Sequence, residues 1–513
     1  MHRILAGLVF VASIASAAAP ERPRLGVLIV IDQLSAYSFD ARIANTKAGL
    51  ATMARDGHRI EELRYQYAPT VTSAGHTTLA TGAWPATHGI VANTWWDEGD
   101  AMEVHSTEDA HYQVLGRPAV KGDCTAPTRM QAPTLGDAMH WNDSRSIVVG
   151  VAPKERSAML MSGKSANAAV WIDSERPFFT TSTYYTKDLY PWVQPINDEL
   201  AKMVAQALKP GLPQGGITGK NPELPVARDG GFGTINEELA WQPTFEKMEV
   251  DAALAAVKAL GMGKDEVPDL LTLSFSSHDV YGHHFGPESQ ESLDCFNRID
   301  GELGRLFAQL DLLVGKGKWV AALSADHGAG KLAEDLVARH IDAGRFDGKA
   351  LKGKLEAEAD TALGQGDWFV GYWTPGVFAR PPVRAKLHTI DERLRAVAKQ
   401  QAGVEDLLPL PRLLSGESFG PLGEIFHRAA YAGRSPDFIV VTRPYWQYGV
   451  LDRVAHGTPY LYDRAVPALF YGAGVKKGAT PYADAVDVAP TLAKLLGVPP
   501  PAAAEGRAIS SVR

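Results

Sequence analysis

Short, continuous apolar runs that end in polar residues recur along this chain of 513 residues. The run from Leu25 to Ile31 ends at Asp32, and the run from Asp269 to Phe275 is followed by His278 and Asp279. An apolar run without alternation is typical of a strand that is buried on both faces of a parallel sheet. Four further runs have the same character: Ile147 to Val151, Trp319 to Leu323, Phe438 to Val441, and Ala468 to Tyr471.

Helix-like stretches separate several of these runs, for example Val250 to Leu260 and Leu293 to Val314. The alternation predicts an α/β fold with a mostly parallel central sheet sandwiched by helices. In such sheets, ligands bind beyond the carboxyl ends of the strands. Asp32, the pair His278 and Asp279, and the pair Asp326 and His327 each follow a run. Because packing does not require these residue types there, they predict a functional site at that edge.

The first nineteen residues have the pattern of a signal peptide. A short positive start precedes the apolar segment Ile4 to Ala12, and mostly small residues fill Ser13 to Ala19. This order is typical of a secretory signal, although an apolar N-terminal helix of a cytosolic protein is the alternative. The apolar segment is shorter than the roughly 20 residues that span a bilayer, and no later stretch is long enough. We therefore expect a periplasmic or secreted protein without a transmembrane segment.

We expect residues 20–513 to form one large α/β catalytic domain with insertions, since an apolar content of 45% supports a sizeable core. Residues 209–233 are rich in Gly and Pro, which predicts an irregular surface loop. The segment 329–455 is expected to contain a cap insertion on this core. It includes a polar stretch at 351–367 and a candidate amphipathic helix at 384–401. Without a coiled-coil pattern, we expect a monomer.

Charge and cysteine content limit the chemistry of the site. The net charge is −8 and no basic stripe is present, which argues against nucleic acid as a surface-bound partner. A negatively charged protein that binds phosphate must supply positive charge locally. Cys124 and Cys295 are the two cysteines, and an exported chain permits either a disulfide or two buried thiols. Two cysteines cannot make a cysteine-rich zinc site, so any metal must bind His and carboxylate side chains.

Candidate metal ligands occur in characteristic pairs. Asp279 and His283 are separated by one helical turn, which places both side chains on one helix face. Asp326 and His327 are adjacent, and His456 precedes a predicted strand. A lone His is more often a satisfied core or surface residue. Together with Asp32, however, the set offers three carboxylates and three imidazoles, which are ligands that zinc accepts.

A hydroxyl group near a predicted helix N-terminus is the candidate nucleophile. Thr72 and Ser73 precede Thr77 to Leu79, which are predicted to begin a helix. Backbone N–H groups and the helix dipole at such a position favour an incoming phosphate. The alternative is that Thr72 or Ser73 serves only as an N-cap, which is a common role for hydroxyl residues.

Three further side chains are suited to binding phosphoryl oxygens. Lys154 and Arg156 would point to the same side of an extended segment after Pro153 and form a clamp for oxyanions. A solvated charged loop is the alternative. Asn93 can donate a hydrogen bond to a phosphate oxygen, although Asn is also a common turn residue.

The order and spacing of these residues resemble the alkaline phosphatase superfamily. The resemblance is to bacterial threonine-nucleophile alkaline phosphatases, which look like nucleotide pyrophosphatase/phosphodiesterases with an added Lys-x-Arg. It extends from about Leu25 to Gly497. The matching segments are VIDQ, PTVTSAGH, TGAWPATHGIVAN, PKER, SHDVYGHH, SADHG, HGTPYLYD and DVAPTL.

The resemblance implies two Zn²⁺ ions. One would be bound by Asp279, His283 and His456. The other would be bound by Asp32, Asp326, His327 and the Thr72 oxygen. Asn93, Lys154 and Arg156 would hold the phosphoryl oxygens. We therefore expect a broad phosphate monoester hydrolase that forms a phospho-threonine intermediate and acts on small phosphate monoesters.

Three other functions are compatible with the sequence. A phosphodiesterase or nucleotide pyrophosphatase would hydrolyse diesters faster and would not need the Lys154 and Arg156 clamp. A transferase would pass the phosphoryl group to an alcohol. A catalytically silent protein would only bind zinc or phosphate, which the occupancy of every expected catalytic position argues against.

Overall fold

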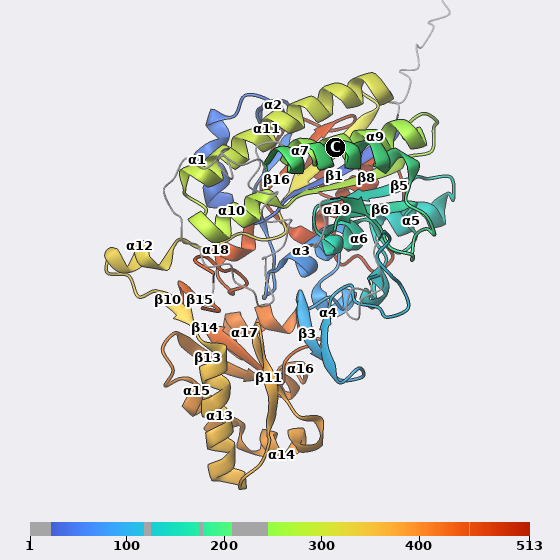
Figure 1. The fold of residues 1–513 in the computed structure, drawn as a ribbon. Helices are drawn as coiled ribbons and strands as arrows, with labels where there is room; N and C mark the ends of the chain where they lie inside the picture. Colours follow the sequence, from blue (N-terminus) through green and yellow to red (C-terminus); the bar gives the residue numbers. More distant parts are fainter. Residues whose placement is uncertain (1–21, 117–124, 174–177, 208–244, 451) are drawn as a thin grey trace, which may run out of the picture.

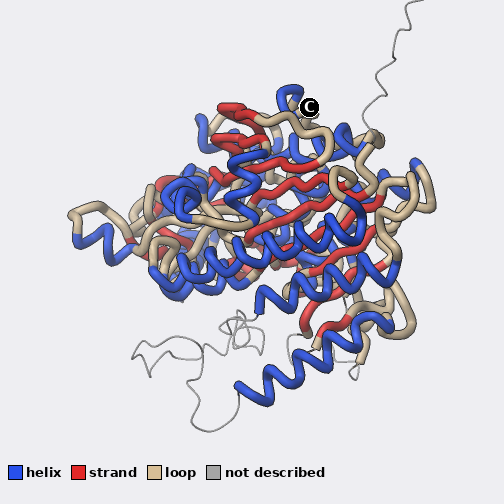
Figure 2. Tube along the Cα trace, turned by 90° about the horizontal axis from the view of Figure 1, so that it is seen from above, coloured by secondary structure: helices blue, strands red, loops and turns tan. Residues whose placement is uncertain are grey.

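The computed structural model describes residues 22–116, 125–173, 178–207, 245–450 and 452–513 (Figure 1). A nine-stranded sheet forms the centre of the larger part of the molecule, and Figure 2 shows it from above between its helices. In spatial order its strands are β17 (Gly478–Asp484), β2 (His58–Arg64), β16 (Ala465–Gly472), β9 (Trp319–Ser324), β1 (Leu25–Ile31), β8 (Asp269–Phe275), β5 (Val148–Val151), β6 (Ala168–Ile172) and β7 (Phe179–Thr180).

Strand β1 lies in the middle of this sheet and is buried along its whole length. It pairs in parallel with β8 on one side and with β9 on the other. The strands from β9 to β6 are all parallel neighbours, whereas β16 runs antiparallel to both β9 and β2. The predicted α/β fold with a mostly parallel central sheet is therefore confirmed, with antiparallel pairings toward its edges.

Helices cover both faces of the central sheet (Figures 1 and 2). One face carries α1 (Ala36–Arg42), α2 (Gly49–Asp56), α7 (Gln194–Ala207), α9 (Phe245–Leu260) and α11 (Gln290–Leu310). The other face carries α3 (Thr72–Thr81), α5 (Leu135–Asn142), α6 (Glu155–Ser162) and α19 (Val488–Leu496). Because the sheet is covered on both sides, its central strands need no polar residues until they reach their ends.

A second, four-stranded sheet is formed by residues between β9 and β16. Its strands, in spatial order, are β11 (Phe369–Trp373), β12 (Gly376–Ala379), β14 (Phe438–Thr442) and β13 (Val404–Pro409). Helices α13 (Gly348–Leu363), α15 (Asp391–Ala398), α16 (Leu410–Leu414) and α17 (Gly420–His427) accompany it. Its interior includes Phe346, Leu355 and Phe438, in an apolar cluster separate from the main core.

Two expectations about this region were wrong. The run Phe438 to Val441 is a strand, but it belongs to the second sheet, where it pairs antiparallel with β12 and β13. A buried apolar run fits any covered sheet, so it does not identify which one. The helix expected at 384–401 is broken into α14 (Arg384–Leu387), a 3₁₀ turn and α15. At the break, the Thr389 hydroxyl donates to the Lys386 carbonyl, a local bond that competes with regular helix.

The predicted signal peptide at 1–19, the loop at 209–233 and Cys124 lie outside the described residues. Cys295 is a buried free thiol on α11. Among the residues that are described, no helix combines the length and apolar character needed to cross a membrane. Further short elements are α4 (Pro85–His88), α10 (Ser277–Phe285), α18 (Leu461–Arg464), β3 (Thr94–Asp97), β4 (Met102–His105), β10 (Gly344–Phe346), β15 (Trp446–Tyr448) and α12 (Ala333–Ala338).

Candidate active site

Three carboxylates meet where the three central strands end. Asp32 directly follows β1, Asp279 lies in the first turn of α10 after β8, and Asp326 follows β9. Since these strands are parallel neighbours, their carboxyl ends lie at one edge of the sheet. All three side chains are at most 1% exposed. Three acidic groups packed so closely away from water require compensating positive charge.

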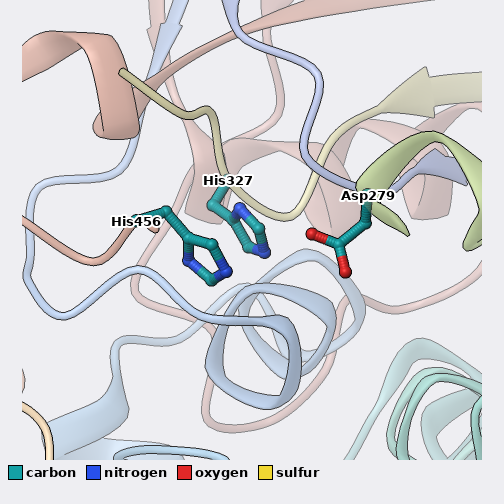
Figure 3. A group of neighbouring side chains, drawn as sticks. All are labelled: Asp279, His327 and His456. Carbon is teal, nitrogen blue, oxygen red and sulfur yellow. The ribbon is translucent and has the colours of Figure 1, made fainter. Parts of the chain in front are cut away.

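Three imidazoles join the carboxylates. His283 Nε2 lies 3.1 Å from Asp279 Oδ1, as the one-turn spacing on α10 predicted. The rings of His327 and His456 stack with centroids 3.6 Å apart, and Figure 3 shows both beside Asp279. Side-chain ligand atoms cluster within 4.8 Å of one another in two groups: Asp32, Asp326 and His327, and Asp279, His327 and His456. His327 thus belongs to both groups in this structure.

Backbone carbonyls fix the orientation of each imidazole. Nδ1 of His283 donates to the Val454 carbonyl at 2.5 Å, and Nδ1 of His456 donates to the Thr70 carbonyl at 2.9 Å. Nδ1 of His327 faces the Gly328 carbonyl at 3.0 Å. A carbonyl only accepts, so the proton is on Nδ1 in the neutral ring. Nε2 then keeps its lone pair for a metal, as is usual for metal-ligating histidines.

Unsatisfied buried atoms support a cation at this site. Asp32 Oδ1 and His327 Nε2 are buried and have no hydrogen-bond partner among the described residues. Both are acceptors, and both belong to the groups that bring ligand atoms together. Buried acceptors without a donor are costly in a native protein. The donor set of carboxylates and imidazoles therefore fits zinc-type ions at this position.

The carboxylates have different electrostatic environments. Burial raises the pKa of Asp32, and the neighbouring Asp279 and Asp326 carboxylates raise it further. For Asp279, the Lys154 ammonium and His283 outweigh burial and lower the pKa well below the usual range. Lys154 Nζ lies 2.7 Å from Asp32 Oδ2 and 2.6 Å from Asp279 Oδ2. Burial and the neighbouring imidazoles lower the pKa of His456, which keeps it neutral and able to bind a metal.

The first turn of α3, which begins at Thr72, lies beside Asp326. The helix begins at Thr72, five residues earlier than expected, and Val71 is its N-cap. The hydroxyl of Thr72 therefore does not cap this helix, which removes the alternative structural role for that residue. His76, one turn later, has Nδ1 2.8 Å from the Thr72 carbonyl and 3.2 Å from Asp326 Oδ2. These contacts hold the first turn of α3 against the end of β9.

Asn93 is oriented by the same helix terminus. Its side-chain oxygen accepts a hydrogen bond from the Ser73 backbone N–H at 2.9 Å. This bond identifies the amide oxygen, so the amide nitrogen is the group that can donate to a ligand. The Ser73 and Ser106 hydroxyls lie 2.7 Å apart, and the Ser106 N–H donates to the Asn93 carbonyl. Asn93 is thus held at the N-terminus of α3 by its side-chain oxygen.

The expectation that Lys154 and Arg156 lie in one extended segment was wrong. Lys154 is extended, but it is the N-cap of α6, and Arg156 lies in the first turn of that helix. Pro153 precedes this cap, and the chain turns into helix directly after it. Lys154 contacts the carboxylates, whereas Arg156 contacts Glu155 at 3.2 Å. Arg156 Nε is buried without a hydrogen-bond partner in the described part of the chain, and it remains available to an anion.

Two buried polar residues at this site were not among the predicted ones. Gln33 follows Asp32 directly, and its side-chain amide donates to Asp279. His76 contacts Thr72 and Asp326, as described above. For Gln33, its place directly after the apolar run is the signal that could have suggested a role. For His76, the signal was its one-turn spacing from Thr72, although a helical His alone is weak evidence.

Comparison with known proteins identifies related sequences. Residues 26–455 match the family described as type I phosphodiesterase / nucleotide pyrophosphatase. The alkaline phosphatase PafA of Elizabethkingia meningoseptica is 29% identical across 96% of this chain and 94% of its own length. The alkaline phosphatase PhoV of Synechococcus elongatus is 28% identical across 96% of this chain and 93% of its own. A Myroides odoratus protein named a calcium-transporting ATPase is 28% identical across 93% and 92%.

The architecture is also similar to a solved structure. The crystal structure of wild-type PafA superposes with a TM-score of 0.86 at 27% sequence identity. The match covers 96% of this chain and 99% of that one. The similarity therefore includes both the central sheet and the second sheet.

Proposed function

The chain belongs to the type I phosphodiesterase / nucleotide pyrophosphatase family, and on that premise we propose that it is a zinc-dependent phosphate monoester hydrolase. The observation that carries this proposal is the meeting of three carboxylates and three imidazoles beside the N-terminus of α3, which begins with Thr72. Relatives named alkaline phosphatases, which match over most of the chain, support the same reaction. We propose two Zn²⁺ ions as cofactors and small phosphate monoesters as substrates of broad range.

The proposed metal ligands follow the two sides of the site. Asp279, His283 and His456 would hold one ion, and Asp32, Asp326 and His327 together with Thr72 would hold the other. When bound, two such ions lower the pKa of coordinated oxygens and neutralise charge on the attacking and leaving groups. The stacked rings of His327 and His456, one from each proposed group and with centroids 3.6 Å apart, support two adjacent ions.

Thr72 is the proposed nucleophile. Its hydroxyl oxygen attacks phosphorus, the bond from phosphorus to the alcohol oxygen breaks, and the alcohol leaves with a proton. Water then attacks the phospho-threonine, inorganic phosphate departs, and the Thr72 hydroxyl is restored. The N-terminal position on α3 suits this role, because the positive end of the helix dipole favours the negative charge of the phosphoryl group.

Lys154, Arg156 and Asn93 are proposed to contact the non-bridging phosphoryl oxygens. The proposal is supported by the Asn93 side-chain oxygen, which is bonded to Ser73 and leaves the amide nitrogen to donate, and by the buried Arg156 Nε, which has no partner among the described residues. A monoester dianion presents more charge to such groups than a diester monoanion does, so they favour monoester hydrolysis. Preference for a dianion separates monoester hydrolysis from phosphodiesterase activity, which the family description equally allows.

Hydrolysis of p-nitrophenyl phosphate and bis-p-nitrophenyl phosphate, compared at alkaline pH, tests the proposal. Purified full-length protein is assayed with Zn²⁺ and after treatment with a chelator. We expect a strong preference for the monoester, loss of activity on chelation and recovery when Zn²⁺ is added back. A preference for the diester would identify the protein as a phosphodiesterase and not a monoesterase. Activity that survives complete metal removal would contradict the metal requirement.

We further propose that the protein acts in the periplasm or outside the cell as a monomer. The pattern of residues 1–19 supports export, and cleavage is tested by N-terminal sequencing of protein recovered from the cell envelope fraction and medium. The oligomeric state is tested by light scattering of the purified protein. If only uncleaved protein is found, and only in the cytoplasm, export is contradicted. If light scattering gives the mass of a dimer, the monomer is contradicted.

A further inference from the structure

Gln33 occupies an unusual position in the backbone and in the core. It directly follows Asp32, is 0% exposed, and has a φ of 62°. Positive φ is uncommon for a residue with a side chain and marks local strain that the surrounding structure must hold in place. Strand β1 lies between β8 and β9, so a residue just beyond its end lies between the ends of both neighbours.

Gln33 donates to the carboxylates on both sides of Asp32. Its backbone N–H donates to Asp326 Oδ1 at 3.1 Å, and its side-chain amide donates to Asp279 Oδ1 at 2.7 Å. A carboxylate accepts hydrogen bonds, so the amide nitrogen must face Asp279. Gln33, directly after Asp32, therefore connects the two carboxylates that follow the strands on either side of β1.

Gly282 makes room for this side chain. It lies on α10 between Asp279 and His283, and a Cβ atom at this position would overlap the Gln33 side-chain oxygen. Helix propensity favours Ala over Gly within a helix by about 1 kcal/mol. The close approach of the Gln33 amide accounts for glycine here.

We propose that Gln33 is a positioning residue that orients Asp279 and Asp326 for metal binding through its two donor groups. This inference rests on the proposed metal-dependent function. Hydrogen bonds to a ligating carboxylate hold the ligand atom in place, and removing such partners typically lowers metal affinity about 10- to 100-fold. The two donors act on different carboxylates, so their effects can be separated by mutation.

Gln33→Gly removes the side-chain donor and keeps the backbone N–H. Glycine adopts positive φ without strain, so this change isolates the bond to Asp279. Gln33→Met keeps similar bulk but also lacks the donor. Gly282→Ala displaces the amide while leaving Gln33 in place.

The matched control is Gln401→Met. Gln401 is also buried, donates its amide to a carbonyl, and has an unpartnered side-chain oxygen among the described residues, but it lies in the second-sheet region.

Zinc affinity is measured on the full chain by competition with a fluorescent chelator, with Zn²⁺ alone as the probe. Zinc content is measured by mass spectrometry, and thermal unfolding in excess chelator reports folding of each variant. We expect a 10- to 100-fold loss of affinity for Gln33→Gly, Gln33→Met and Gly282→Ala, and wild-type affinity for Gln401→Met. The double variant Gln33→Gly/Gly282→Ala should bind no more weakly than Gln33→Gly, since both changes remove one bond.

The outcomes distinguish this inference from the proposed function. If wild-type protein binds zinc and hydrolyses monoesters while the folded Gln33 variants bind zinc equally well, the positioning role is wrong and the function stands. If effects of Gln33→Gly and Gly282→Ala simply add, the Gly282 part of the inference fails. If wild-type protein does not bind zinc at all, both the function and the positioning role are overturned.

Discussion

The Thr72 hydroxyl, which we propose as the nucleophile, does not cap α3. The N-cap is Val71, and Thr72 begins the helix. We predict that Thr72→Ala lowers kcat/KM for monoesters by at least about 10³-fold, as loss of a nucleophile does in other hydrolases. Thr81→Ala on the same helix is the control, because its hydroxyl donates to the Thr77 carbonyl within α3. A folded, zinc-loaded Thr72→Ala protein with near-normal turnover would exclude the phospho-threonine route.

Lys154 and Arg156 contribute charge at different points of the site. A charged hydrogen bond is worth about 1.5–3 kcal/mol, or roughly 10- to 150-fold in rate. We predict a loss of this size in monoester kcat/KM for Arg156→Ala at saturating zinc, with diester hydrolysis much less affected. Arg145→Ala, which removes an exposed arginine paired with Asp143, is the control. Equal losses for both substrates would show that Arg156 does not select the dianion.

Lys154→Ala, which also changes the charge beside Asp32, is tested separately for zinc affinity.

We predict that the free energy of unfolding depends on pH through Asp463. Burial raises its pKa to about 7, although it accepts hydrogen bonds from the Thr458 N–H and hydroxyl. The folded state therefore holds a proton that the unfolded state has released, between the unfolded pKa near 4 and the folded pKa near 7. The free energy of unfolding should fall as pH rises through this window and level off above it.

Asp463→Asn tests this dependence, because an amide of the same shape does not titrate. In chelator-treated protein, the midpoint of thermal unfolding is measured from pH 4 to pH 8 for both chains. We expect the variant to lose less stability than wild type over this range, by up to a few kcal/mol at about 1.4 kcal/mol per pKa unit. Parallel curves would show that Asp463 titrates normally in the folded protein.

At the scale of single elements, α3 must approach the end of β9 closely. A Cβ atom at Gly75 would overlap the backbone of Asp326, because the first turn of α3 packs on that segment. We predict that Gly75→Ala moves this turn, lowers the thermal midpoint and reduces monoester turnover by at least tenfold. Gly353→Ala, on α13, is the control: a Cβ there meets no atom within 4 Å. It should raise stability by about 0.5–1 kcal/mol. A Gly75→Ala protein with normal stability and turnover would contradict this packing argument.

Prediction from the sequence was most accurate for elements that depend on one local property, such as burial or helical spacing. The run before Asp32 is a buried strand as predicted, and Asp279 and His283 share a helical turn, because burial along a run and helical spacing are local properties. The segment around Lys154 was misread because Pro153 is compatible with both an extended strand and the start of a helix. Gln33 was missed because its role depends on two partners that are more than 240 residues away in sequence.

At the scale of the whole molecule, the path of the chain connects the second sheet to the active site. His456 follows the second sheet and precedes β16, and its Nδ1 donates to the Thr70 carbonyl near the start of α3. The Ala455 N–H donates to the Gln447 side chain on β15. The sequence indicated an insertion between Gly328 and Ala455, but pattern alone did not reveal that this segment forms its own sheet. The boundaries 1–19, 20–513 and 329–455 remain predictions.

Because the proposed ligands follow β1, β8 and β9 and lie in the His456 loop, metal binding should stabilise the whole fold. A ligand at 100 times its Kd stabilises the folded state by about 2.7 kcal/mol if it binds only that state. We predict that added Zn²⁺ raises the thermal midpoint of chelator-treated protein, and that His456→Ala reduces this rise. The control is His427→Ala, since His427 also donates Nδ1 to a backbone carbonyl, that of Leu413, but lies in the second-sheet region. If zinc raises the midpoint of His456→Ala as much as that of wild type, His456 does not bind the metal, and the contact between the His456 loop and α3 is structural only.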